Sequence, residues 1–445
     1  MIETNIKEAF STDVKSFSIY DCQRSIPSGI DGFKPAMRKI IYGMLKKFPN
    51  QEVKVSIAAS GIQEVSCYHH GSLEGTIVNM AQSFTGSNNV PYLLDIGQFG
   101  SRIGPSAAAS RYIFTKLSDS FRKLFLKDDD TILVHQNDDG DVIEPEYYLP
   151  IIPTILMNGS DGMGTGFACK ILNYHPVDLV KVCEEFINKG SIKTELIPWY
   201  KGFTGTVERN GQQTVFTGCY TIESTTTLKI TELPVGSFTQ KYRDVLNDLE
   251  DKNIVKSYID NSSEEKTEFI VTCPRETLRK THDELLKTFK LVSRETENFT
   301  VWNENFKLKK FDSAKELVEW FVTFRLTKYE ERRLKLIEMS NDTLVKLNER
   351  KKFIEFYLDN SSWFSKTKKI DIVNELKTKG FINIDDLLSI RVYNLTKDEI
   401  DSLVEKIQQE KANLDILMNT TNKKLYLNDL QACKSYFKGN EYAKN

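Results

Sequence analysis

Arg111 and Tyr112 are the neighbouring residues in this chain with the clearest capacity for covalent chemistry. They follow a loop rich in glycine, serine and alanine (residues 97–110), and small side chains of this kind let a bulky polymer backbone approach closely. A tyrosine hydroxyl has a pKa near ~10, so it needs nearby positive charge to attack a phosphoryl group. Arg111 could supply that charge and stabilise the attacked group. The alternative interpretation is that Tyr112 is a packed aromatic side chain without a catalytic role, as in most Arg-Tyr pairs taken alone.

Two further segments place cations or histidines at the start of a predicted helix. In DGFKPAMRK, Pro35 suits a first helical turn, so Lys34 lies just before the helix and Arg38 projects from its first turn. These residues are a candidate phosphate-binding site. The alternative is a helix start whose charged side chains are simply solvated. In CYHHGSLEG, His69 and His70 precede a second apolar helical stripe, which Ser72 could cap. A hydrogen bond to phosphate or DNA is favoured here over zinc, with a structural histidine as the alternative.

A glycine-rich segment, NGSDGMGTGFA, contains Met163. It lacks the order of a dinucleotide loop and the ending of a P-loop, so a turn that presents Met163 outward is the better interpretation. Such an apolar tip could wedge between base pairs. Eight acidic residues lie in residues 128–148, but their spacing does not match an EF-hand loop, which favours a solvated turn.

The elements that must position these residues follow from the prolines and glycines. All 12 prolines lie at or before Pro274, and only two of the 23 glycines follow it, which predicts a mainly helical last third. Residues 312–358 predict one long amphipathic helix or a pair, and residues 397–418 predict another. These helices suggest an antiparallel coiled-coil arm, with a simple bundle as the alternative. The middle predicts strands in residues 202–215, 220–233 and 268–273, and helices in 235–249 and 274–291.

Composition narrows the class of protein. The chain has 445 residues, enough for two to four domains, and a formal net charge of −2. This near-neutral total conceals a basic region, because residues 1–127 hold 15 Lys and Arg against 10 Asp and Glu. No secretory or membrane segment is visible. The seven scattered cysteines form no CxxC pair and predict a soluble protein of a reducing compartment.

Taken together and in order, six segments resemble the breakage-reunion (A-type) subunit of type IIA DNA topoisomerases. They are DGFKPAMRKIIYG, YHHG, FTGSNNVPYLLDIGQFGSR, AAASRYIFTKL, EPEYYLPIIPTILMNGSDGMGTGFA and LLSIRVYNLTKDE. Each is modest alone, but the series is specific and covers most of residues 27–170 and part of the C-terminal arm. A chain of this size most resembles the medium subunit of T-even-type phage topoisomerases.

The resemblance implies an α+β multidomain fold. Its expected parts are a winged-helix DNA-cleavage domain (1–148), an α/β tower domain (149–306) and a long helical coiled-coil arm with a C-terminal dimer gate (307–445). The implied function is DNA cleavage and religation in an ATP-dependent type II topoisomerase, an isomerase that makes a transient double-strand break for duplex passage.

The resemblance also implies roles for single residues. Tyr112 would be the nucleophile that joins a DNA 5′-phosphate, and Arg111 would stabilise the phosphoryl charge. The residues expected to contact DNA are Lys34, Arg38, His69, His70 and Arg102. Met163 falls where the family usually has an intercalating isoleucine.

The expected partners follow from what the chain does not display. It contains no ATPase motif and no TOPRIM signature, so Mg²⁺ and ATP are expected mainly on a separate large subunit that carries ATPase and TOPRIM domains, with no metal ligands in this chain. Double-stranded DNA and a second copy, bound through the C-terminal arm, complete the expected assembly. The expected location is cytoplasmic and nucleoid-associated, in the host cell if the chain is phage-encoded. The alternatives are the A-type chain of a bacterial topoisomerase IV or gyrase, and a non-catalytic winged-helix architectural protein.

Overall fold

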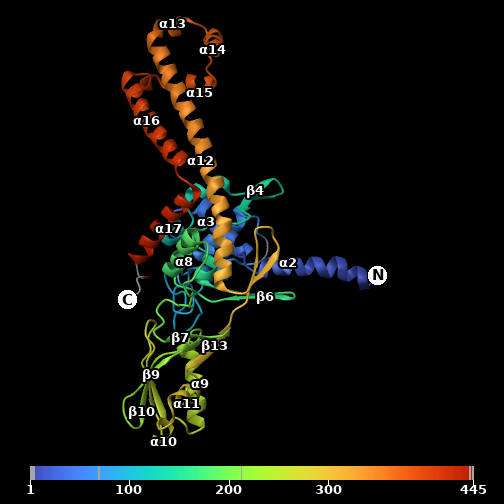
Figure 1. Cartoon of the computed structure of the whole chain (residues 1–445), viewed down its shortest axis with the longest axis vertical. Helices are drawn as coiled ribbons and strands as arrows, with labels where there is room; N and C mark the ends of the chain where they lie inside the picture. Colours follow the sequence, from blue (N-terminus) through green and yellow to red (C-terminus); the bar gives the residue numbers. More distant parts are fainter. Residues whose placement is uncertain (1–5, 69–70, 212, 440–441, 443–445) are drawn as a thin grey trace. The chain divides into compact units, whose positions relative to one another are not determined.

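The chain folds into two compact units, which are coloured by sequence in Figure 1. The computed structural model describes residues 6–68, 71–211, 213–439 and 442. Residues 1–325 and 427–445 form the first unit, and residues 326–426 form the second. The mixture of helices and strands confirms the predicted α+β class.

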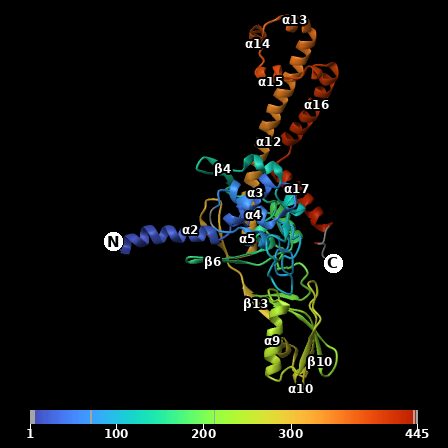
Figure 2. The ribbon, with the colours of Figure 1, turned by 180° about the vertical axis from the view of Figure 1, so that it is seen from behind.

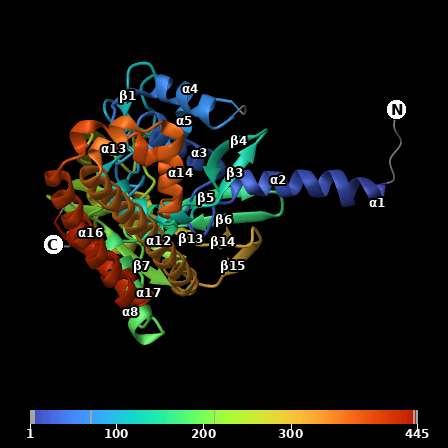
Figure 3. The same cartoon turned by 90° about the horizontal axis from the view of Figure 1, so that it is seen from above.

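The N-terminal part of the first unit is helical with two short pairs of strands. Its helices are α1 (Ile6–Ala9), α2 (Lys15–Ser25), α3 (Pro35–Lys47), α4 (Val55–Val65), α5 (Glu74–Ala81) and α6 (Asp119–Leu124), with a π-helix at Phe10–Val14 and a 3₁₀ helix at Lys127–Ile132. Its strands are β1 (Val53–Lys54), β2 (Phe114–Thr115), β3 (His135–Asp138) and β4 (Asp141–Pro145). Strand β1 pairs with β2, and β3 with β4, both antiparallel. Within this unit, α2 extends outward toward the N-terminus (Figure 3).

Two glycines allow α3 and α4 to pack closely. A Cβ atom on Gly43 of α3 would lie 2.6 Å from the Cγ1 atom of Ile62 on α4. A Cβ atom on Gly61 of α4 would lie 2.8 Å from the ring of Phe48. The helices therefore approach one another where a side chain is missing, and apolar residues of both helices are buried.

The next segment contains a short helix, a β-hairpin and a longer helix. These are α7 (Thr154–Asn158), β5 (Ser160–Gly164), β6 (Phe167–Ile171) and α8 (Pro176–Lys189). In the hairpin, Met163 pairs with Ala168 and Gly162 pairs with Cys169.

The middle of the chain is an α+β region, as predicted. Its strands are β7 (Thr206–Asn210), β8 (Gln213–Thr217), β9 (Cys219–Ile222), β10 (Thr227–Glu232), β11 (Ser257–Asp260), β12 (Phe269–Thr272), β13 (Val292–Thr296), β14 (Phe299–Trp302) and β15 (Leu308–Phe311). They form antiparallel sheets of order β11-β12-β10-β9, β13-β8-β7 and β14-β15. Its helices are α9 (Thr239–Asp251), α10 (Arg275–Leu278) and α11 (His282–Thr288), and α9 lies beside the four-stranded sheet (Figure 2).

One helix expected in this region is divided in two. The predicted helix over 274–291 breaks between α10 and α11, where Thr281 and Glu284 form a capping box that starts a new helix. Apolar side chains of α9, α11 and the four-stranded sheet make a common core, which includes Tyr242, Leu246 and Phe269.

The second unit is helical. Helix α12 (Ala314–Asp359) is one continuous helix that starts in the first unit, and it is followed by α13 (Ser361–Lys366), α14 (Lys369–Thr378), α15 (Ile384–Leu388), a 3₁₀ helix at Val392–Asn394 and α16 (Lys397–Asn419). Helix α17 (Asn422–Lys438) leads back into the first unit. Among the described helices, none has the length and apolar character needed to cross a bilayer.

Helices α12 and α16 run antiparallel. Arg333 donates a hydrogen bond to the carbonyl of Leu417, and further along the pair Arg350 bonds to Glu399. A later residue of α12 thus contacts an earlier residue of α16, which is the antiparallel direction predicted from the sequence.

Candidate functional site

Tyr112 lies on the surface of the first unit, with 67% of the residue exposed. Its neighbours hold it on both sides, because the first amides of α4 bind the loop that carries it. Val55 N donates to the carbonyl of Ile113 (3.0 Å), and Ser56 N donates to the carbonyl of Ser110 (3.3 Å). The N-terminal amides of a helix lack partners within the helix, so they are free to fix this loop. The result is an exposed phenol on a fixed backbone.

Arg111 lies over the ring of Tyr112, the side chain whose reaction it was expected to assist. Its Cζ atom lies 5.0 Å from the centroid of the Tyr112 ring, within the range of a cation–π interaction. Both side chains are exposed, so a phosphate of a bound polymer could reach the guanidinium and the hydroxyl together. The arrangement suits nucleophilic attack on a phosphoryl group with a cation beside the developing charge.

Lys34 joins the start of α3 to the β5–β6 hairpin. Its ammonium donates a hydrogen bond of 2.8 Å to the carbonyl of Asp161, and partial burial lowers its pKa. Lys34 also lines a cavity of about 430 Å³ whose other polar lining includes Arg24, Asn79 and Asn88. Two cations and two amides in one cavity provide donors for a phosphate-containing backbone.

Arg38 is buried, and most of its guanidinium is used within the protein. It donates to both carboxylate oxygens of Asp31 (2.9 and 3.2 Å) and to the carbonyl of Phe33 (3.3 Å). Burial opposes the charge of Arg38, but the Asp31 carboxylate outweighs it and raises the pKa of the guanidinium. The expected contact of Arg38 with the DNA backbone therefore fits this position poorly, because the side chain mainly braces the loop before α3.

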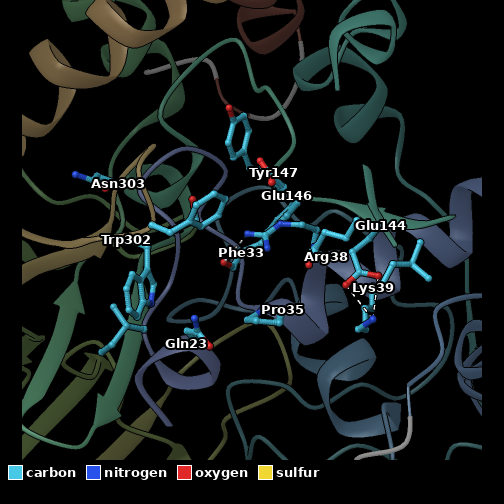
Figure 4. Close-up of a pocket in the computed structure, with 15 residues that line it drawn as sticks. Gln23, Phe33, Pro35, Arg38, Lys39, Glu144, Glu146, Tyr147, Trp302 and Asn303 are labelled. Carbon is cyan, nitrogen blue, oxygen red and sulfur yellow. Dashed lines mark hydrogen bonds and ion pairs between the residues drawn. The ribbon is translucent and has the colours of Figure 1, made fainter. Parts of the chain in front are cut away.

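Figure 4 shows Arg38 and Lys39 in a second cavity, of about 350 Å³, opposite Trp302. Lys39 forms an ion pair of 2.9 Å with Glu144 there. Asp31 and Glu144 are organising residues that the sequence interpretation did not single out. Asp31 and Arg38 are seven positions apart, and only the turn between them in the folded chain brings them together. Their spacing in the sequence therefore did not indicate a buried ion pair.

Arg102 is also buried, contrary to what a DNA contact requires. Its guanidinium forms an ion pair with Glu232 and lies 3.4 Å from the carbonyl of Leu233. The expected contact of Arg102 with DNA therefore fits this position poorly, because Glu232 already balances its charge inside the protein. His69 and His70 lie outside the described residues. The Ser72 hydroxyl accepts a hydrogen bond from Glu74 N (3.1 Å). The N-cap position of α5 is Leu73, so Ser72 lies one residue before the position at which it was expected to cap the helix.

Met163 projects from the β5–β6 hairpin with 81% of the residue exposed, the outward position that the sequence predicted. The opposite face of the hairpin packs on α2. A Cβ atom on Gly162 would lie 2.1 Å from the Ser25 carbonyl oxygen, and one on Gly164 would lie 3.0 Å from Cys22 Sγ. At the turn, Asp21 accepts hydrogen bonds from the amide and hydroxyl of Thr165, both 2.8 Å. The glycines therefore allow close docking on α2, which leaves Met163 on the free face.

The acidic segment does not gather into a metal site in the part of the chain that the structure describes, where no group of three or more His, Cys, Asp or Glu side chains could hold a metal ion. Asp129 instead forms a buried ion pair of 2.8 Å with Arg325. Asp139 and Gly140 have positive φ angles of 50° and 97° and form the turn between β3 and β4. The predicted solvated turn is confirmed only between β3 and β4, because Asp129 and Glu144 of the same acidic segment are buried in ion pairs.

Comparison with known proteins places these features in a family context. A family model that describes the A-type chain of DNA gyrase/topoisomerase IV matches residues 24–432. DNA topoisomerase 2 from Plasmodium falciparum (isolate K1 / Thailand) is 37% identical over 468 residues, which cover 93% of this chain and 33% of that protein. Mitochondrial DNA topoisomerase 2 from Dictyostelium discoideum is 35% identical over 432 residues, with coverages of 93% and 34%. This chain thus spans about a third of the length of these relatives.

A solved structure is also similar. The crystal structure of the Plasmodium falciparum topoisomerase II DNA-binding, cleavage and re-ligation domain matches with a TM-score of 0.91 and 36% identity. The match covers 96% of this chain and 64% of that one. At this identity and coverage, nearly the whole of this chain has a fold similar to part of that solved chain.

Proposed function

The chain belongs to the family of A-type chains of DNA gyrase and topoisomerase IV, and from this premise we propose that it carries out DNA cleavage and religation in an ATP-dependent type II DNA topoisomerase. The observation that carries the proposal is the exposed Tyr112 on a loop fixed by α4, with the Arg111 guanidinium on its ring. A packed aromatic residue would be buried, whereas this phenol is presented to solvent.

In the proposed reaction, the Tyr112 hydroxyl attacks a backbone phosphorus of duplex DNA. A bond forms between the tyrosine oxygen and phosphorus, the bond from phosphorus to the 3′ oxygen breaks, and the phenolic proton is transferred to that oxygen. The phosphotyrosine ester retains the energy of the broken bond, so the 3′ hydroxyl can attack it and reseal the strand. Arg111 lies where it can stabilise the charge on the phosphoryl group during both steps.

The proposed assembly extends beyond this chain. Mg²⁺ and ATP would bind mainly on a separate large subunit with ATPase and TOPRIM domains, and two copies of this chain would pair through the C-terminal arm. The same proposal includes the division into a winged-helix domain (1–148), a tower (149–306) and an arm (307–445). It also includes a location on nucleoid DNA in the cytoplasm and a particular resemblance to the medium subunit of T-even-type phage topoisomerases. The sequence resemblance supports these points.

Covalent trapping tests the proposed reaction. The complete enzyme that contains this chain is mixed with Mg²⁺ and end-labelled duplex DNA, denatured rapidly and analysed for protein attached to 5′ ends. We expect attachment in the wild type and none in Tyr112→Phe, which lacks the attacking oxygen. Tyr20→Phe is a matched control, because Arg24 lies over the Tyr20 ring at 5.6 Å in a similar pair.

Two results would contradict the proposal. Attachment that persists in Tyr112→Phe would show that another residue is the nucleophile. Tight DNA binding by the wild type without any attachment would favour the architectural alternative.

A further inference from the structure

We infer that Arg102 and Glu232 hold the Tyr112 loop in its reactive position, so that Arg102 is a positioning residue for cleavage. The inference rests on the proposed function of Tyr112. It assigns a role to a buried pair that joins the nucleophile loop to the sheet of strand β10 and to helix α9.

The pair is deeply buried and its carboxylate is fully used. The side chains of Arg102 and Glu232 are each 6% exposed. One Glu232 oxygen accepts from the Arg102 guanidinium and from Leu233 N (2.9 Å). The other accepts from the amide and the hydroxyl of Thr204 (3.1 and 3.0 Å). A buried carboxylate with this many donors is a rigid anchor, because any movement leaves a charge or a donor unsatisfied.

The backbone of the same loop segment binds the start of α9. Thr239 N donates to the carbonyl of Arg102 (3.0 Å), and Gln240 N donates to the carbonyl of Ile103 (3.1 Å). These amides belong to the first turn of a 13-residue helix and have no partner within it. The loop is therefore attached to the β10–α9 region through both its side chain and its main chain.

A short series of hydrogen bonds continues from this anchor to Tyr112. The Gln82 amide nitrogen donates to the carbonyls of Phe99 (2.8 Å) and Pro105 (2.9 Å), which flank Arg102 in sequence. Ala108 N then donates to the Gln98 carbonyl (3.0 Å). Beyond Ala108, the α4 amides hold the residues on both sides of Tyr112, as described above. The position of β10 and α9 is thus transmitted to the nucleophile through fixed backbone.

This arrangement predicts a specific separation of effects. A direct DNA contact contributes to affinity, whereas a positioning residue contributes to the rate of reaction from the bound state. Loosening the anchor should leave DNA affinity unchanged and slow the attack of Tyr112. A displacement of about 1 Å in a reacting group can cost about 10²-fold in rate.

The test compares R102M/E232Q, R102K and wild type within the complete enzyme. The double variant removes both charges, so neither is left buried alone, and R102K keeps the charge without the forked geometry. At saturating DNA and Mg²⁺, we expect covalent attachment to slow by about 10²-fold in the double variant and by less in R102K. DNA affinity should stay at the wild-type value, and amide hydrogen exchange at Ala108 and Tyr112 should become faster.

A matched control is the pair of Asp129 and Arg325, which is equally buried and lies outside this loop. D129N should lower the free energy of unfolding without changing the rate of attachment. Wild-type attachment rates in R102M/E232Q would overturn the inference, and so would a loss of DNA affinity as large as the loss of rate. If the wild type itself forms no adduct, the proposed function fails, and the exchange of Ala108 and Tyr112 still reports whether the pair fixes the loop.

Discussion

At the scale of single residues, burial separates side chains that look alike in the sequence. Arg111 is exposed beside Tyr112, whereas Arg38 and Arg102 are buried in ion pairs with acidic partners. A buried guanidinium that is already bonded to a carboxylate contributes to folding and positioning, and it is not available to a phosphate. An arginine in a basic segment is therefore a good candidate for DNA contact only when its partners leave it free.

Met163 provides a test at this scale. Because its side chain projects from a hairpin that is docked on α2, we expect Met163→Ala to reduce the bending of bound DNA and to lower cleavage. The bend angle can be measured by energy transfer between dyes at the two DNA ends. Met339→Ala is a control, because Met339 is an exposed methionine in the second unit. Unchanged bending in Met163→Ala would rule out the wedge.

At the scale of elements, the close contact of α3 with α4 is set by glycine. We expect Gly43→Ala to lower the free energy of unfolding by about 1–3 kcal/mol, because the added methyl group would lie 2.6 Å from Ile62. Gly75→Ala in α5 is the matched control. Apart from its chain neighbours and the backbone of its own helix, no atom of the described residues lies within 4 Å of its added methyl group, so we expect stabilisation by about 0.5–1 kcal/mol.

Urea unfolding of both variants measures these effects. If Gly43→Ala proved as stable as the wild type, α3 and α4 would have to be able to move apart at no cost.

The C-terminal half of α8 offers a test of pH dependence. Hydrogen bonds from Thr194 lower the pKa of Glu185 to about 2, and the Thr194 amide lies 3.2 Å from its carboxylate. Because the folded pKa lies below the ordinary glutamate value of 4.5, ionised Glu185 stabilises the folded state above pH 4.5. This contribution declines as the pH falls from 4.5 toward about 2. Glu185→Gln should therefore be less stable than the wild type at about pH 6, and the difference should shrink between about pH 5 and 3.

Urea unfolding at several pH values checks this expectation. A difference between wild type and Glu185→Gln that did not change with pH would mean that the ionised carboxylate is not the stabilising form.

At the scale of the whole molecule, the second unit carries exposed apolar side chains at the end of its long helices. Ile382 and Val392 are 77% and 75% exposed in the segments that connect α14 to α16. Contiguous exposed apolar surface marks protein–protein contacts, whereas single exposed apolar residues are common on any protein. Ile382 and Val392 are consistent with the proposed pairing of two copies through the arm.

Placing charges at these two exposed positions should weaken self-association of the chain. Ile382→Glu and Val392→Glu together should raise the dissociation constant of the dimer, because each buries a charge in the proposed contact. Sedimentation velocity over a range of protein concentrations measures this change. Ile197→Glu in the first unit is the control, since Ile197 is an exposed isoleucine (49%) outside the proposed contact. A double variant that dimerised like the wild type would exclude these residues from the contact.

Much of this protein is determined by local sequence. The loss of proline and glycine after Pro274 predicted the helices of the last third, because these two residues are the ones that interrupt helices. Periodic apolar residues predicted α12, and β-branched residues between turns predicted most of the strands in the middle. The glycines around Met163 predicted its exposure, although Met163 lies in strand β5 and not in a turn. Each of these features depends on the conformational preferences of neighbouring residues.

Other features were decided only by tertiary structure. The ion pair of Arg102 with Glu232 joins residues 130 positions apart, and Asp129 meets Arg325 across 196 positions. No local preference signals such a pair, because its stability comes from desolvation and from partners that only the fold brings together. The sequence could thus identify Tyr112 and Arg111 as candidates, whereas the fold decided which other cations remain on the surface and which fix the loop that carries Tyr112.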